Sequence, residues 1–449
     1  MKRTYFTLTL LLLSALAVTA AGQAYHGSYF FENSLQRSRM NAAFTPGRNY
    51  IVVPALGGIA LDARSNVGLE HFVFPITSKN YLFLSEKINA ESFLGNLPDE
   101  GSSLQGNASV ELGGVGLKIG RNGFLTAGLS LYAEADATVP NELFRMAKYG
   151  RTATQDAYSI TGLGAAGGSR AEIALGYSHD MGDWVEGLRA GARVKFLSGL
   201  RAAGLEDGRI DVRMADDELA VNTQATALVA GFHYSEGRFS KDPFSIRGFG
   251  AAVDFGAEYR LRFDGFLNGL NLSASVNDLG VLRYGAKEFS ANNSFSFKGF
   301  QDIDLDEDLD LGTQVDRVVE ELRGLMDVQE GGEGRIRSDM APRIFAGAEV
   351  PFLHEMMSVG LLYYNVDRAS HLMASFNLTP LSWLDFGLHY TFLGPAKTWG
   401  FYAEFVPRRY ASAFVGMDLR SFESLRTNGQ HIPIHPFATS FCLGVNVLL

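Results

Sequence analysis

Alternation of apolar and polar side chains is the dominant pattern along the chain. In residues 249–263, FGAAVDFGAEYRLRF, the odd positions are apolar and the even positions are small or charged. Successive side chains of a β-strand point to opposite faces, so this stretch predicts a strand with one continuous apolar face. The phase holds for 15 residues, whereas an ordinary strand has about 5–6. Either a protein core or lipid must cover such a face.

The same alternation recurs from near residue 50 to the C-terminus. Short turn-like breaks separate most of these stretches and no helical crossover joins them, which predicts sequential antiparallel pairing. The clearest examples are residues 188–201, 270–277, 384–392 and 437–449. Less regular stretches lie near 50–64, 108–119, 123–137, 170–180, 207–215, 218–230, 286–299, 341–350, 355–365, 371–379, 398–406 and 409–419.

Three features favour lipid as the cover over the core of a soluble β-protein, which is the alternative. Several stretches keep phase long enough for a tilted membrane-crossing strand, which needs about 9–11 residues. Their second face is rich in Gly, Ser, Asn and charged residues, as a barrel lumen is. The chain also carries an export signal. Since a sheet in lipid must close, we predict an all-β fold, a closed antiparallel up-and-down transmembrane β-barrel of about 14–16 strands.

The N-terminal residues predict export followed by a plug. Lys2 and Arg3 precede a short apolar run and then small residues, which is the layout of a signal peptide, assigned here to residues 1–22. Residues 23–48 mix aromatic residues with arginine, which favours a plug in the lumen over a disordered tail. Residues 49–449 form the predicted barrel. The plug candidates are Arg37, Arg39, Asn41 and Phe44.

One insertion, residues 300–340, interrupts the β pattern. Residues 313–328 place apolar side chains on one stripe, which predicts a short amphipathic helix in a long loop over a barrel mouth; the side of the membrane stays open. The acidic run before it suggests a hard cation, but Leu309 and Val315 stand where an EF-hand loop needs Gly and Glu. A solvated acidic loop is therefore favoured. The weak metal candidates are Asp304, Asp306, Asp308 and Asp310.

Charge and cysteine content exclude several classes of protein. The net charge of −10 and the pI near 5.5, with no dense basic block, argue against nucleic-acid binding. Cys442 is the only cysteine, which rules out an internal disulfide framework and cysteine-rich zinc sites.

Charged residues on the polar faces are expected to point into the lumen. They are expected either to pair across the interior and fill it, which we favour, or to form a polar constriction that selects a solute. The lumen-lining candidates are Arg189, Arg193, Lys195, Asp254, Glu258, Arg260, Asp385 and His389.

Catalytic motifs are sparse. The sequence has no H-E-x-x-H, no G-x-S-x-G and no P-loop. His389 beside Thr391 is one conceivable piece of a hydrolase site, but nothing else in the sequence supports it. We predict that the protein is not an enzyme and has no cofactor.

Three stretches resemble a known family. SRMNAAFTP (38–46), residues 251–280 and residues 432–449 resemble segments of a Gram-negative outer-membrane barrel family, the domain of unknown function 5723. That family looks related to the FadL-like long-chain fatty-acid channel superfamily, whose members carry an N-terminal plug inside a barrel. Ala42 stands where the family usually has proline, and Leu449 where assembled barrels usually end in an aromatic residue. The resemblance supplies no ligand residue.

Two functions follow as expectations. The first is a channel in the Gram-negative outer membrane for a small apolar or amphipathic solute. The second is a non-transporting barrel that anchors or assists a surface or secretion assembly. An apolar pocket beneath the plug with a path outward would favour transport, and a lumen filled by charge pairs would favour the second. Expected partners are outer-membrane lipid, the barrel-assembly machinery and a small hydrophobic solute.

Overall fold

The wall of the molecule is a single 18-stranded sheet with antiparallel pairings. The structure, a computed structural model, describes residues 25–76, 79–152, 154–215, 219–235, 238–241, 245–263, 265–297, 329–366, 369–394, 397–407, 410–419, 424–427, 430–433 and 435–449. No helix of this part of the chain is both long enough and apolar enough to cross a membrane.

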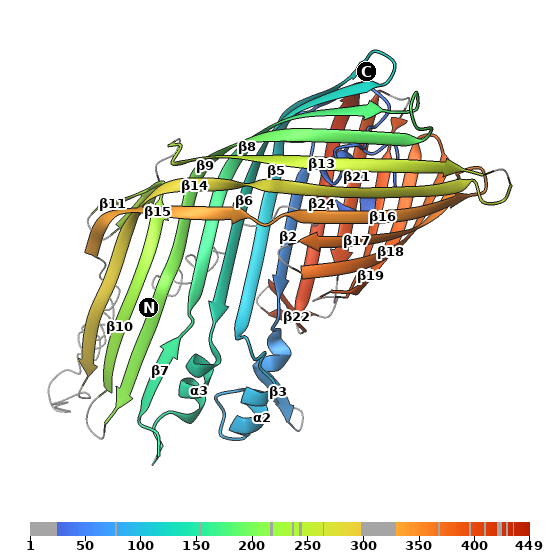
Figure 1. Ribbon diagram of the computed structural model, residues 1–449. Coiled ribbons are helices and arrows are strands. Elements are labelled where there is room, and N and C mark those ends of the chain that lie inside the picture. Colours follow the sequence, from blue (N-terminus) through green and yellow to red (C-terminus); the bar gives the residue numbers. More distant parts are fainter. Residues whose placement is uncertain are drawn as a thin grey trace.

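The sheet closes into a barrel (Figure 1). In order around the wall, the strands are β1 (Tyr50–Val52) with β2 (Ile59–Ser65), β5 (Ser102–Ile119), β6 (Gly123–Val139), β7 (Ala157–Thr161) with β8 (Gly164–Asp180), β9 (Leu188–Met214), β10 (Leu219–Ala230) with β13 (Gly248–Arg262), β14 (Gly269–Phe297), β15 (Gln329–Met340) with β16 (Arg343–Phe352), β17 (Met357–Val366), β18 (Ala369–Leu381), β19 (Leu384–Leu393), β20 (Thr398–Phe405), β21 (Ala411–Leu419) and β24 (Phe437–Leu448). Strands joined by "with" follow one another in the same position of the wall, so the barrel has 14 strands. Closure is made where β24 pairs with both β1 and β2. The predicted fold class is confirmed.

The exposure of the side chains on β13 shows which of its two faces points out of the barrel. Phe249 and Phe255 are 71% and 53% exposed on the outside of the barrel, whereas Asp254 and Glu258 are 0% and 3% exposed. The apolar row therefore faces outward and the polar row faces the lumen. Trp383 and Tyr410 are also exposed, beside the short connections near the C-terminus, where a membrane barrel carries an aromatic girdle.

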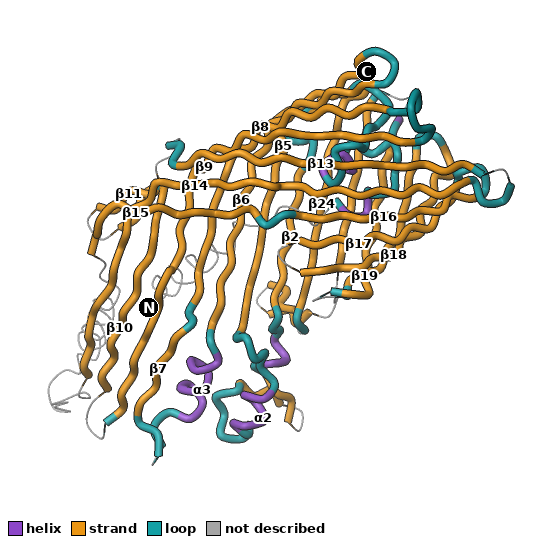
Figure 2. The backbone as a smooth tube through the Cα atoms, viewed as in Figure 1, coloured by secondary structure: helices purple, strands orange, loops and turns teal. Residues whose placement is uncertain are grey.

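One side of the wall is much taller than the other (Figures 1 and 2). β9 has 27 residues and β14 has 29, whereas β20 has 8 and β21 has 9. At a rise of ~3.3 Å per residue, β14 is about 95 Å long, far more than a bilayer needs. We call the part of β5–β10, β14 and β15 beyond the closed barrel the tall wall. It curves away from the end where the chain terminates.

A small aromatic module caps the far end of the tall wall. It contains η3 (Leu69–His71), the β3–β4 hairpin (Val73–Ile76 and Lys79–Leu82), α2 (Ala90–Gly95) and α3 (Asn141–Tyr149). Phe93 is fully buried there, its ring stacked 4.5 Å from that of Phe83 and edge-on to that of Phe144. Two further hairpins, β11–β12 (Phe232–Ser235, Arg238–Lys241) and β22–β23 (Ser424–Thr427, Gln430–Pro433), lie outside the main sheet.

Local predictions differ from the structure in two respects. Residues 270–277 and 286–299, expected as separate stretches, belong largely to the single strand β14. Its alternation changes phase where Asp278 adopts a φ of 61° beside a register shift. The helices α2 and α3 were not predicted. The predicted helix 313–328 and Asp304, Asp306, Asp308 and Asp310 lie outside the described residues.

Candidate functional site

The N-terminal segment lies inside the barrel. We call residues 25–44 the plug; they include the short 3-10 helices η1 (His26–Ser28) and η2 (Gln36–Arg39). Tyr29, Asn41 and Ala43 are fully buried, and Phe44 is 2% exposed. The barrel wall provides that burial, so the predicted plug is confirmed as part of the fold.

Glycines on the inner wall make room for the plug. A Cβ on Gly347 would lie 2.6 Å from Cε1 of Tyr29, and one on Gly387 would lie 2.8 Å from Cζ of Phe31. Real Cβ atoms essentially never come within 3.0 Å of another heavy atom in this way. The same close approach occurs at three more inward glycines, each against a plug residue: Gly191 against Ala42, Gly256 against Asn41, and Gly360 against Phe30.

Aromatic rings pack one side of the plug against the wall. The ring of Phe31 stacks on Tyr402 with centroids 5.6 Å apart, and His26 stacks on Tyr364 at 4.0 Å. The Ser34 and Tyr402 hydroxyls are hydrogen-bonded at 2.9 Å. This side, against the short strands β16–β21 and β24, is a largely aromatic core.

Hydrogen bonds hold the middle of the plug to the wall. The Asn41 side-chain amide donates to the carbonyls of Ala257 and Ala274, at 3.1 and 3.2 Å. Ser275 and Asn277 donate to the Met40 carbonyl, at 2.6 and 2.7 Å. The Met40 carbonyl lies outside the sheet, so the bonds from Ser275 and Asn277 satisfy a buried backbone acceptor that no strand pairs.

Ion pairs fill the lumen on the opposite side, in two groups. In the first, Glu258 pairs with Arg37 at 3.1 Å, with Arg260 at 2.9 Å and with Arg189 at 3.4 Å. Arg37 comes from the plug and the others from β9 and β13. The Glu258 side chain is 3% exposed, so its charge is stabilised by these partners rather than by water.

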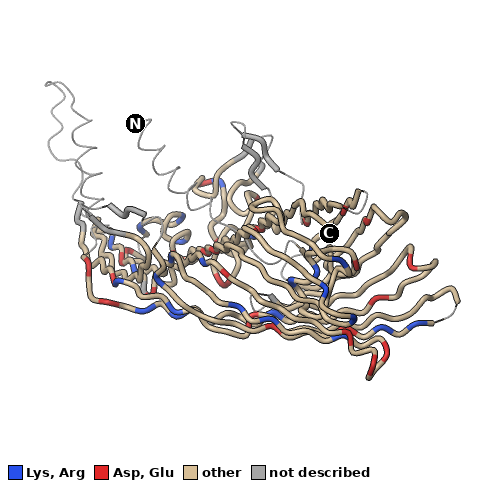
Figure 3. The backbone as a smooth tube through the Cα atoms, turned by 90° about the horizontal axis from the view of Figure 1, so that it is seen from above, with Lys and Arg blue, Asp and Glu red and all other residues tan. Residues whose placement is uncertain are grey.

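The second group lies at the register shift of β13 and β14. Lys195 pairs with Asp254 at 2.9 Å and with Asp278 at 2.6 Å, while Arg193 pairs with Asp254 at 3.4 Å. Asp278 also pairs with Arg343, and its backbone N–H donates to Asp254 at 2.8 Å. Lysine and arginine lie beside acidic residues along the barrel strands (Figure 3).

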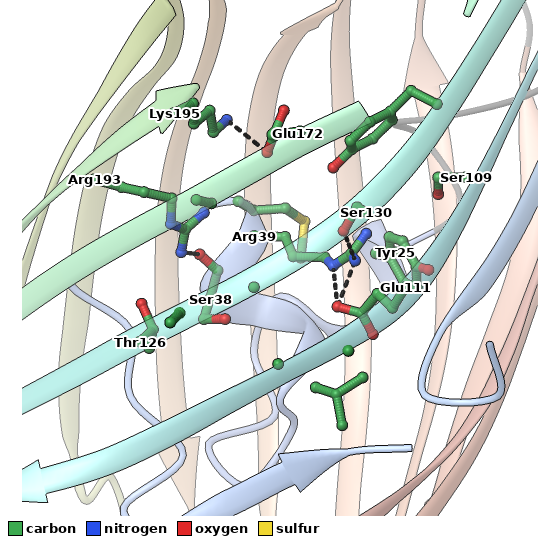
Figure 4. Close-up of a pocket in the computed structure, with 18 of the residues that line it drawn as sticks. Tyr25, Ser38, Arg39, Ser109, Glu111, Thr126, Ser130, Glu172, Arg193 and Lys195 are labelled. Atoms are coloured by element: carbon green, nitrogen blue, oxygen red, sulfur yellow. Dashed lines mark hydrogen bonds and ion pairs between the residues drawn. The ribbon is translucent and has the colours of Figure 1, made fainter. Parts of the chain in front are cut away.

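Two further contacts join the plug to β5 and β9. The Arg39 Nε donates to Glu111 at 2.9 Å, and Arg193 donates to the backbone carbonyl of Ser38 at 2.6 Å. Figure 4 shows these contacts around a small cavity between the plug and strands β5, β6, β8 and β9.

The remaining predicted residues lie apart from these pairs. Asp385 is 4% exposed and lines a polar cavity of about 180 Å³ beneath Phe31. The Nε2 atom of His389 contacts Asp418, whose other carboxylate oxygen accepts from Ser440. The Asp418 carboxylate therefore lies between the imidazole and the Ser440 hydroxyl, whereas in a catalytic triad the histidine lies between the acid and the hydroxyl. Within the described ranges, no group of three or more His, Cys, Asp or Glu residues is arranged to hold a metal ion.

Sequence reasoning missed Glu111, Glu172, Asp278 and Arg343. Glu111 and Glu172 lie in stretches that were expected to be strands, and their inward phase could have identified them. Asp278 lies at a register shift and Arg343 at the first position of a strand, where alternation gives no signal.

A family model matches most of the chain. The Family of unknown function (DUF5723) matches residues 42–418. The chain belongs to this family. A search of curated proteins found no match.

Several solved structures are similar to this DUF5723 chain over most of its length. The toluene transporter TbuX of Ralstonia pickettii has a TM-score of 0.46 and 8% identity, over 96% of this chain and 98% of that chain. A FadL homologue of Pseudomonas aeruginosa has a TM-score of 0.46 and 11% identity, over 96% of this chain and 99% of that chain. The toluene transporter TodX of Pseudomonas putida has 0.41 and 10%, over 91% of each chain. With these scores and identities, the likenesses assign no function or site to this chain.

Proposed function

We propose that the protein is a sealed barrel of the outer membrane that anchors or assists a surface or secretion assembly, and that it passes no solute in this state. The filled lumen is the observation that supports the proposal. The charges that could have lined a channel are paired with one another, and the plug occupies the space between them.

Energetics make the filled lumen a stable arrangement. Moving the plug would separate Arg37 from Glu258 and Arg39 from Glu111. Leaving a buried charge without a partner costs about 3–5 kcal/mol; Glu111 would lose its arginine, whereas Glu258 would keep Arg189 and Arg260. The cavities beside the plug, about 80 and 180 Å³, are lined by many polar side chains, so neither is the apolar pocket that transport predicts.

The tall wall is the part that we propose meets other proteins. In a bacterial barrel the short turns face the periplasm and the long connections face outward. Here the short turns lie at the end where β24 finishes, so the tall wall and its aromatic module would stand outside the cell. The predicted signal in residues 1–22 and the barrel-assembly machinery would bring the chain there, with lipid covering the row of Phe249.

Transport of a small apolar or amphipathic solute is a second candidate, and one observation favours it. In the described part of the chain, no strand pairing joins residues 25–44 to the wall. Side chains supply the contacts between them, so the plug is built to move as a unit if something releases it.

A disulfide between plug and wall tests the two candidates. The Cβ of a residue at position 27 would lie 2.9 Å from the Cβ of Tyr402, so Gly27→Cys with Tyr402→Cys needs only a small shift to reach disulfide geometry. Liposomes carrying this variant would be assayed, oxidised and reduced, for arabinose swelling and for uptake of a fluorescent fatty acid. The sealed barrel predicts no uptake in either state. Uptake that appears on reduction and stops on oxidation would establish transport instead.

A further inference from the structure

One inward position of the wall differs from the glycines that receive the plug. Gly128 on β6 faces the lumen, but the nearest atom to a Cβ at this position is the Gly113 carbonyl oxygen at 3.9 Å. No plug atom comes close. The wall is therefore recessed here as it is at Gly256 or Gly347, yet the recess is left unfilled.

The recess opens into the cavity of Figure 4. Its volume is about 80 Å³, between the plug and strands β5, β6, β8 and β9. A protein cavity of ~150 Å³ holds benzene, so this one has room for roughly three or four non-hydrogen atoms by the same measure. Thr126, Ala127 and Ala174 also line the cavity.

Unused hydrogen-bonding groups line this cavity. The Tyr25 hydroxyl and the Ser109 hydroxyl have no hydrogen-bond partner within the described part of the chain, although Tyr25 is 3% and Ser109 2% exposed. Beside these two hydroxyls lies the carboxylate of Glu172, which is 6% exposed and lies 3.9 Å from the Lys195 ammonium group. Buried polar groups of this kind are normally satisfied. A molecule with both donors and acceptors would satisfy them.

The charges around the cavity are already balanced. Arg39 pairs with Glu111, Arg193 with Asp254, and Arg343 with Asp278, while Lys195 pairs with Asp278 and, at 3.9 Å, with Glu172. Four cations therefore face four carboxylates. A charged guest would leave its charge unpaired in a buried site, which is costly. The chemistry therefore selects an uncharged guest.

We propose that this cavity binds a small, uncharged, polar solute of three or four non-hydrogen atoms with both a hydrogen-bond donor and an acceptor. The solute lies between the plug and the wall, donates to Glu172 and bonds the hydroxyls of Tyr25 and Ser109. Because the cavity exists only while the plug is seated, binding stabilises the seated plug by mass action.

Three probes of the same shape test the charge rule: acetamide, acetate and acetamidinium. Each has four non-hydrogen atoms and a methyl group whose saturation-transfer signal can be read on the purified full-length protein. The expected result is a signal from acetamide, with acetate and acetamidinium at least tenfold weaker. Equal signals from all three, or none from acetamide because the site holds water only, would overturn the proposal.

Variants test whether the acetamide signal comes from this cavity. Gly128→Leu fills the recess and is expected to abolish acetamide binding. Gly204→Leu, on the tall wall where nothing lies within 4 Å of the Cβ, is the matched control and should keep it. Should Gly128→Leu fail to fold, Tyr25→Phe removes one hydroxyl without changing shape and is expected to weaken binding about fivefold. Acetamide binding unchanged in Tyr25→Phe and in any folded Gly128→Leu would contradict the assignment.

Discussion

Single glycines on the inner wall decide whether the plug fits. Gly256 is the clearest case because the place of its missing Cβ is taken by the side-chain oxygen of Asn41, whose amide bonds two wall carbonyls. A larger residue there must displace Asn41 and its two hydrogen bonds, each worth about 1 kcal/mol.

Gly256→Val is therefore expected to unseat the plug. Overpacking adds about 1–3 kcal/mol to the lost bonds, and trypsin should then cleave after Arg37 and Arg39, which the seated plug protects. Gly204→Val, in open space, serves as the control. Protection of Arg37 and Arg39 that is equal in both variants would mean that the glycine is not needed for the fit.

Asp254 is the most buried member of the lumenal charge network. Replacing it with alanine leaves Lys195 without its partner at 2.9 Å and Arg193 without its partner at 3.4 Å. Asp254→Ala should lower the free energy of unfolding by about 3–5 kcal/mol, measured by heat-induced gel mobility shift and urea titration in detergent. The exposed pair of Arg209 and Asp211 provides the comparison: Asp211→Ala should cost at most about 1 kcal/mol. Equal losses would show that burial of the network contributes nothing.

Among the elements, the aromatic module at the far end of the tall wall has a core of its own. Phe93 is in contact with Phe83 and Phe144 there, far from the plug. Phe93→Ala should cost this module about 3–5 kcal/mol. Amide exchange in α2 should quicken while β13 and β14 keep their protection. Leu84→Ala, at a residue 54% exposed, is the control. Loss of protection in the barrel strands as well would mean that the module and the wall unfold together.

The alternation in the sequence predicts where the strands lie better than it predicts how long they are. Residues 249–263 predict β13 almost to the residue because the alternation is uninterrupted. In β9 and β14 the pairing register shifts and the alternation changes phase. The sequence of each strand therefore predicts two separate stretches. Alternation also does not mark where lipid ends and water begins, so the tall wall was not predicted. Contacts such as Arg37 with Glu258, 221 residues apart, follow from closure of the barrel and have no local signature.

For the whole molecule, the plug and the lumenal charges act as one seal. The rings and the backbone of the plug pack against the inner wall. The lumenal charges neutralise one another in pairs. The wall outside the seal provides the tall surface that we propose other proteins contact. The plug closes the lumen and the aromatic module lies far from it, so conductance should depend on the plug and not on the aromatic module.

The measurement that tests this account most directly is single-channel conductance of the purified protein in planar bilayers, with and without residues 25–48. The account predicts no current from the intact protein and a steady pore once the segment is deleted. A barrel of 14 strands is much wider than the eight-stranded barrels that side chains alone can fill. Current through the intact protein would contradict the sealed lumen and make transport the function to pursue.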